Sequence, residues 1–373
     1  MMRARALVTA VLASALFAPA AKASIALAPL PALRQARAEL TGLTSAAGAR
    51  RKLDAATAAS LWVDPSDLVA PPAGKAVFAA SRAALLDLEP VLSSPSPPAA
   101  ITTAESLILT ADRRLAETAI REAAHGLGLV VRAKGMVLSG DRWAATVRVD
   151  LAAEQYGTAW ADAFGGLTPL AVTPAENVPP TALATAAQNA LANGRIAFSS
   201  VRAVQNQPPL TADARPEVLL VGPDSCATCE LESWGVVEAL SQFGVFANLE
   251  LSQSAVRRRP IVRGITFRDA SYGSPYVAFA IAKPSSDVPL PSIDVANKYA
   301  DVGSPTSPGV AGGLFWTKLS GSLSRPKTAA GQAIDGTAEL LTAEVCEATA
   351  GVPAEVCGTA AVQGYQERLP PAP

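Results

Sequence analysis

Histidine, aromatic residues and charge are all scarce in this sequence, and each shortage excludes a class of protein. The 373 residues contain one histidine, His125, and only 5% of them are aromatic. One histidine gives almost no support to a Ser-His-Asp triad or a histidine-rich metal centre. We expect His125 to be a solvated residue at the end of a helix, just before Gly126. The formal net charge of -1 excludes the strongly basic face on which non-specific nucleic-acid binding depends.

Long apolar runs are absent as well, apart from one at the start of the chain. Met1 to Arg5 form a short basic head, residues 6–20 are mostly apolar, and Ala21-Lys22-Ala23 offers a small-x-small cleavage site. This order is typical of a secretory signal peptide, and the apolar stretch is shorter than the roughly 20 residues that cross a bilayer. We therefore expect a secreted or extracytoplasmic protein, cleaved near Ala23 and not stably inserted in a membrane, in a compartment where disulfides persist.

What the sequence does contain is alanine-rich helical periodicity. Half of the residues are hydrophobic and many of these are alanine, which favours helix but buries little area, so we expect closely packed helices. Between about residues 33 and 164, apolar residues recur at spacings of three and four, which predicts an all-helical, loosely bundled region. Two stripes are the clearest: Ile108, Ala111, Leu115 and Ala119, and then Val149, Ala152, Tyr156, Trp160 and Ala163.

The pattern changes in the second half of the chain, which is long enough for two domains. Residues 166–210, rich in proline, alanine and asparagine, predict a linker with one short helix near 182–191. After it, apolar runs and helical spacing alternate as in an α/β domain, with strands expected at 217–221, 246–251, 265–267 and 276–282 and helices at 226–243 and 334–349. The predicted division is a signal peptide (1–23), a helical region (24–165), the linker (166–210), an α/β domain (211–360) and a tail (361–373).

The motif with the most evident chemistry is Cys226-Ala-Thr-Cys229, directly after the strand predicted at 217–221. At the first turn of a helix, free N–H groups and the helix dipole lower the pKa of a thiol. Cys226 would then attack a substrate disulfide, and Cys229, one turn later and more buried, would resolve the mixed disulfide. Asp224 or Ser225 is expected to cap this helix. The motif therefore predicts a catalytic redox pair.

Other interpretations of the pair remain open. An exported Cys-x-x-Cys also occurs as a structural disulfide, in a protein that catalyses nothing. Acidic neighbours oppose formation of a thiolate electrostatically: Asp224, Glu230 and Glu232. Zinc would need further ligands, and the ten residues between Cys346 and Cys357 fit no standard zinc motif, so we expect neither a metal nor another cofactor.

Cys346 and Cys357 form the second cysteine pair. Four cysteines allow three disulfide connectivities, and proximity favours Cys226 with Cys229 and Cys346 with Cys357. The second bridge would close a loop of about a dozen residues, worth about 3 kcal/mol in the chain-entropy model. A structural role is the preferred interpretation, and a second redox relay is the alternative.

Four separate stretches of the C-terminal half together carry a resemblance to a known family. They are "RPEVLLVGPDSCATCELESWGVVEALSQFGVFANLELSQS", "ITFRDASYGSPYVAF", "SIDVANKY" and "AIDGTAELLTAEVCEATAGVPAEVC". Over about residues 211–358 the chain resembles the exported proteins of the domain of unknown function 929 family. The resemblance implies a thioredoxin-like fold, makes Trp234 a candidate neighbour of the cysteines, and supports pairing Cys346 with Cys357.

The chain departs from this family pattern at two places. Members usually have Pro-Tyr between the first two cysteines, a dipeptide that tunes the reduction potential, and this chain has Ala-Thr. Members also tend to have Thr-Pro-Thr before a later strand, where this chain has residues 262–264 with Arg263 in the centre. The resemblance thus implies that the proline facing the cysteines in thioredoxin folds is missing, unless Pro260 takes its place. Arg263 and Pro260 are accordingly candidate neighbours of the site.

The sequence as a whole predicts an α/β thioredoxin-like C-terminal domain preceded by an all-α helical-bundle region. The function it favours is an exported thiol–disulfide oxidoreductase acting on thiol or disulfide protein substrates. The alternative is a non-catalytic secreted protein with structural disulfides. A catalyst should have Cys226 accessible, the pair at a helix N-terminus and a groove beside it, whereas a structural bridge should have both sulfurs buried.

Overall fold

The computed structural model describes residues 27–64, 67–68, 73–123, 127–146, 148–222, 226–254, 261–283, 289–323 and 325–371. Several predictions fall outside these ranges, namely the signal peptide at 1–23, the helix end at His125, the cap at Asp224 or Ser225, and the substitute proline Pro260. Two regions of different architecture make up the described part of the chain.

The first region is helical, as the periodicity predicted. Its helices are α1 (Pro29–Glu39), α2 (Ala47–Ala56), α3 (Ala73–Leu92), α4 (Ala99–Glu122), α5 (Leu127–Ala145) and α6 (Val149–Glu176), with a small hairpin of β1 (Trp62–Asp64) and β2 (Asp67–Leu68). Helices α1 and α6 pack against α4, and α5 lies along α6. Every residue of the two predicted stripes is buried, so the alanine-rich faces let these helices approach closely.

The sequence pattern did not predict α5, because glycines weaken its helical signal. Three residues nevertheless form a buried stripe at helical spacing: Val130, Ala133 and Val137. A Cβ atom at Gly140 would lie 2.5 Å from a ring carbon of Tyr156 in α6. A glycine is therefore needed at this position for the two helices to pack so closely.

Helix α6 corrects the boundary that we placed at residue 165. Residues 166–210, predicted as a linker, contain the second half of α6, then α7 (Pro180–Ala192) and β3 (Val201–Ala203). The short helix predicted near 182–191 is α7. The chain stays helical through Pro169 and Pro174 because its buried stripe continues past them: Leu167, Ala171 and Ala175.

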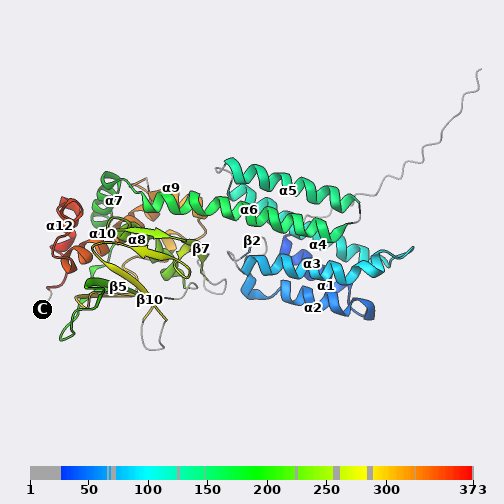
Figure 1. The fold of residues 1–373 in the computed structure, drawn as a ribbon, viewed down its shortest axis with the longest axis horizontal. Coiled ribbons are helices and arrows are strands. Elements are labelled where there is room, and N and C mark those ends of the chain that lie inside the picture. Colours follow the sequence, from blue (N-terminus) through cyan, green and yellow to red (C-terminus); the bar gives the residue numbers. More distant parts are fainter. Residues whose placement is uncertain are drawn as a thin grey trace, which may run out of the picture.

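Aromatic side chains connect this long helix to the second region. The ring centroids of Trp160 and Phe164 lie 4.5 Å apart, and those of Phe164 and Trp316 lie 5.9 Å apart. Trp316 begins α9 (Trp316–Leu323), and its indole N–H donates to the carbonyls of Ser252 and Gly264 at 3.1 and 3.0 Å. Helix α6 thus belongs to the core of both regions, and it runs from one to the other in Figure 1.

The second region is built on a mixed sheet. Its strands follow the order β10 (Ala278–Ala282), β5 (Arg215–Val221), β11 (Ser292–Val295), β12 (Tyr299–Val302) and β3, and β4 (Thr211–Ala212) pairs with the start of β5. Strand β10 is parallel to β5, β11 is antiparallel to β5, and β12 is antiparallel to β11. The strand predicted at 217–221 is therefore in the interior of the sheet, and its Val218 is fully buried.

Helices and two further hairpins complete this region. Helix α8 (Ala227–Ser241) packs against α10 (Ala329–Ala348), and both can be followed beside the sheet in Figure 1. The hairpins pair β6 (Val245–Ala247) with β9 (Ser271–Gly273) and β7 (Glu250–Gln253) with β8 (Arg263–Thr266). The single strand predicted at 246–251 is wrong: the chain changes direction at Asn248, whose φ of 60° separates β6 from β7.

The end of the chain also differs from the prediction. Residues 361–373 were expected to form a tail, but the described part of this segment includes most of α12 (Ala360–Gln366). The Tyr365 side chain is buried, and its hydroxyl donates to the carbonyl of Ala187 in α7 at 2.9 Å. Among the described residues, no helix combines the length and the apolar character that crossing a membrane demands.

Candidate functional site

Cys226 and Cys229 form a disulfide at the point where β5 gives way to α8. The run of apolar residues in β5 ends at Val221, and α8 begins at Ala227. The two Cα atoms of the bridge are 5.2 Å apart. The bond therefore lies at the carboxyl end of an interior strand and at the amino end of a 15-residue helix.

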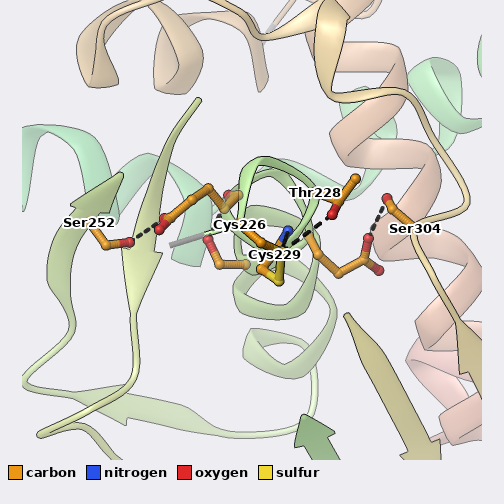
Figure 2. The surroundings of a disulfide bond; sticks show 8 residues. Cys226, Thr228, Cys229, Ser252 and Ser304 are labelled. Carbon is orange, nitrogen blue, oxygen red and sulfur yellow. Dashed lines mark hydrogen bonds between the residues drawn. A yellow bond between two sulfur atoms is a disulfide. The ribbon is translucent and has the colours of Figure 1, made fainter. Parts of the chain in front are cut away.

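Cys226 itself caps this helix. The backbone N–H of Cys229 donates to Cys226 Sγ at 3.0 Å, and the Thr228 hydroxyl lies 3.4 Å from the same sulfur (Figure 2). These groups, with the helix dipole, favour negative charge on Cys226 Sγ whenever the bond is reduced. The environment is thus suited to a thiolate.

Both cysteines of this bridge are half-buried. A groove of about 400 Å³ opens beside Cys229. Residues from β5, α8, the end of β8 and β10 line it: Leu220, Gly222, Cys229, Glu230, Ser233, Ile265, Phe267, Arg268, Ile281, Ala282 and Lys283. The bridge therefore meets two of the conditions set for a catalyst, a helix N-terminus and an adjacent groove, and Cys226 is partly accessible.

A proline lies next to the disulfide, but not at the position that the resemblance implied. The Leu290–Pro291 peptide bond is cis and directly precedes β11. A Cβ atom built at Gly222 would lie 3.4 Å from Cys229 Sγ and 3.9 Å from Pro291 Cβ. Pro291 is therefore a further candidate neighbour of the cysteines, beside the Pro260 that the sequence offered. A proline immediately before an apolar strand was the available signal, and we did not use it.

Trp234 and Arg263 are brought together, but in the core. The Trp234 side chain is fully buried, and its indole N–H donates to the carbonyl of Arg263 at 2.8 Å. The Arg263 guanidinium carbon lies 4.2 Å from the ring centroid of Phe315 and 5.0 Å from that of Trp316. These contacts fix α8 against β8, and neither Trp234 nor Arg263 lines the groove beside Cys229.

This arrangement can be compared with known proteins. Residues 201–288 match the Domain of unknown function (DUF929). The match confirms the resemblance for this part of the chain. No curated protein and no solved structure matches.

The DUF929 segment contains most of the elements around the first disulfide. It runs from β3 through β5, the cysteines and α8 to β10, and so includes the whole lining of the groove. Pro291, the β11–β12 hairpin and the second disulfide lie beyond its end at residue 288.

Two buried carboxyl side chains flank the cysteine-bearing turn of the DUF929 segment. Ser252 donates a hydrogen bond to Glu230, and Ser304 donates to Glu232 at 2.8 Å. Figure 2 shows Ser252 and Ser304 on opposite sides of the disulfide. Burial, and then the nearby Asp301, raise the pKa of Glu232 to about 8. At neutral pH Glu232 is therefore mostly uncharged and opposes a thiolate less than the sequence suggested.

Further buried carboxyl side chains lie in β12 and α10. Burial raises the pKa of Asp301 to about 7, and burial, followed by repulsion from Asp301 and Glu232, raises the pKa of Glu344 well above its ordinary value. Burial, and then repulsion from Asp335, raise the pKa of Glu238. Burial raises the pKa of Asp335 as well, although its hydrogen bond with Glu238 lowers it in part. In the described part of the chain, no cluster of such residues is arranged to hold a metal ion. The raised pKa values favour the protonated, neutral forms of these buried carboxyls.

The second disulfide joins Cys346 and Cys357, as proximity predicted. Cys346 lies in the last turn of α10 and Cys357 ends α11 (Ala354–Cys357). The side chains are 0% and 5% exposed. This bridge closes the turn between two helices and lies in the core, and it does not line the groove beside Cys229.

Proposed function

We propose that the protein is an exported thiol–disulfide oxidoreductase that acts through Cys226 and Cys229. One observation carries the proposal: this disulfide is half-buried at a helix N-terminus, next to a groove, whereas the other disulfide is buried. Export is part of the proposal, and the sequence of the first 23 residues and the two disulfides support it.

We also propose that the C-terminal region is a thioredoxin-like domain. The order β10-β5-β11-β12, with β11 antiparallel to its neighbours, supports this assignment. So do the positions of the cysteines after β5 and of Pro291 before β11. We assign β5, α8, β10, β11, β12 and α10 to the core of this domain and regard the helical region as an addition to it.

The proposed reaction consists of two thiol–disulfide exchanges. A substrate thiolate attacks Cys226 Sγ, a new bond forms between the two sulfurs, and Cys229 leaves as a thiolate. A second substrate thiolate attacks the substrate sulfur of this mixed disulfide, and Cys226 leaves as a thiolate. The substrate has then lost two electrons and two protons and carries a disulfide, while the protein carries two thiols. The same steps in reverse reduce a substrate disulfide.

The surrounding groups support these steps. In the mixed disulfide, the thiolate that leaves from Cys226 is stabilised by the Cys229 N–H, the Thr228 hydroxyl and the dipole of α8. No cofactor is needed, because the exchange is complete within the two cysteines and the substrate.

The test is catalysed reduction of insulin by dithiothreitol, compared among three proteins. The wild type should accelerate the reaction, and Cys226→Ser should lose at least about a hundredfold of that acceleration because the nucleophile is gone. The matched control is the double variant Cys346→Ser/Cys357→Ser, which should retain the activity while it remains folded. Equal rates for wild type and Cys226→Ser would reject catalysis and favour the non-catalytic alternative.

A further inference from the structure

The groove beside Cys229 lies on one particular side of the disulfide. Strand β5 separates β10 from β11 in the sheet. Ile281, Ala282 and Lys283 of the groove come from the β10 side, whereas Pro291 precedes β11 on the other side. The β10 side and the β11 side of the disulfide thus differ, and the groove that Cys229 lines lies on the β10 side.

The base of the groove is apolar. The register places Leu220 of β5 directly beside Ile281 of β10, so both side chains lie on the same face of the sheet. Ile281 is 45% exposed, although it is a large apolar residue in a strand. Ile265 and Phe267 complete the apolar wall. Such a surface accommodates an aliphatic or aromatic side chain.

The rim of the groove is basic. Arg268 and Lys283 are both exposed and both line it. Among the described lining residues the one carboxyl group is that of Glu230, which is buried and accepts a hydrogen bond from Ser252. Among the described residues, Lys283 therefore places an exposed positive charge at the rim, which complements an anionic group.

We propose that this groove binds an extended polypeptide segment with an apolar and an acidic residue next to its cysteine. The apolar side chain lies against Leu220 and Ile281, and the acidic one lies near Lys283. The cysteine of the segment then lies beside the Cys226–Cys229 bond. The inference rests on the proposed function, since it names the class of substrate on which this redox pair acts.

The test uses the oxidised full-length chain and two synthetic dithiol peptides. The peptides are identical except that the first cysteine is followed by Leu-Glu in one and by Leu-Lys in the other. The peptide dithiol becomes a disulfide as the protein disulfide becomes two thiols, and mass spectrometry of alkylated samples gives the rate. We expect the Leu-Glu peptide to react about three to ten times faster at low ionic strength, and the ratio to fall as salt is added.

Three variants locate the origin of this preference. Lys283→Glu should abolish or invert the ratio of the two rates. Lys134→Glu is the matched control, because Lys134 is an exposed lysine on α5, a helix of the first region (Figure 1) that does not line the groove, and the ratio should not change. Ile281→Ser should slow both peptides without changing their ratio.

The outcomes separate the two proposals. Equal rates for the two peptides in the wild type, or an unchanged ratio in Lys283→Glu, would overturn the acidic-segment inference while leaving the redox function intact. If neither the peptides nor dithiothreitol reduced Cys226–Cys229 in the wild type, both proposals would fail.

Discussion

The two disulfides of this protein are attached to opposite ends of their helices. Cys226 caps the N-terminus of α8, where the helix dipole and backbone N–H groups favour a thiolate. Cys346 lies in the last turn of α10, where the dipole has the opposite sign and disfavours one. The first bridge is half-buried and the second is fully buried. The same covalent bond thus has a reactive environment in one place and an inert environment in the other.

The difference shows that the spacing of cysteines does not by itself determine their role. A Cys-x-x-Cys pair and a pair eleven residues apart both form bridges here. What distinguishes them is which end of a helix holds the sulfur and whether a partner molecule can reach it. Stability and reactivity are therefore expected to depend on different bridges, and this expectation can be tested.

The largest expected effect is on stability. Cys346→Ser/Cys357→Ser should lower the free energy of unfolding by about 3 kcal/mol through loop-closure entropy, and burial of two hydroxyls should add to the loss. The Cys226–Cys229 bridge closes a shorter loop, and the serine hydroxyls that replace it would be partly exposed. Cys226→Ser/Cys229→Ser should therefore lower the free energy of unfolding by about 2 kcal/mol or less. Urea denaturation of both variants measures the difference. An equal or larger loss for the Cys226 and Cys229 variant would contradict the assignment of structural and reactive bridges.

A smaller effect is expected from the carboxyls beside the first disulfide. The folded protein raises the pKa of Glu232 from 4.5 to about 8 and that of Asp301 from 3.8 to about 7, so it holds protons that the unfolded chain releases. The stability due to these protons is complete below about pH 4 and is lost as the pH rises to about 8. Thermal unfolding should therefore show a melting temperature that falls between pH 5 and pH 8.

Glu232→Gln tests which carboxyl is responsible, because glutamine resembles the protonated side chain. The fall in melting temperature should be smaller in this variant by a few degrees. Glu89→Gln is the matched control, since Glu89 is exposed on α3, and it should behave like the wild type. A fall that is identical in wild type and Glu232→Gln would show that Glu232 does not hold its proton in the folded state.

The helical stripes and the position of the first disulfide were predictable from the sequence. Both rest on local patterns, the 3.6-residue period in α4 and α6 and an apolar run that ends four residues before a Cys-x-x-Cys pair. Helix α5 and the continuation of α6 past Pro169 were not predictable, because packing against neighbouring helices overrides the glycine and proline signals. The sequence contains no information on those contacts that a local pattern could reveal.

The candidate site was predicted only in part, for a related reason. The hairpin of β11 and β12 turns at Ala296 and Asn297, both with positive φ, without the glycine that usually marks such a turn. Missing this hairpin meant missing Pro291 in front of it. Glu232 was interpreted as a charge near the cysteines, but burial keeps it mostly protonated. Both features depend on tertiary contacts.

The most direct test of the difference between the bridges is to measure the reduction potential of each in the same protein. The full-length chain is equilibrated in thiol–disulfide buffers of graded potential, the free thiols are alkylated, and mass spectrometry gives the reduced fraction of each pair. Cys226–Cys229 should have a potential above about -300 mV, and Cys346–Cys357 should have one below that value. If Cys226–Cys229 remained oxidised below about -300 mV, like its buried counterpart, the assignment of a reactive and a structural bridge would be wrong.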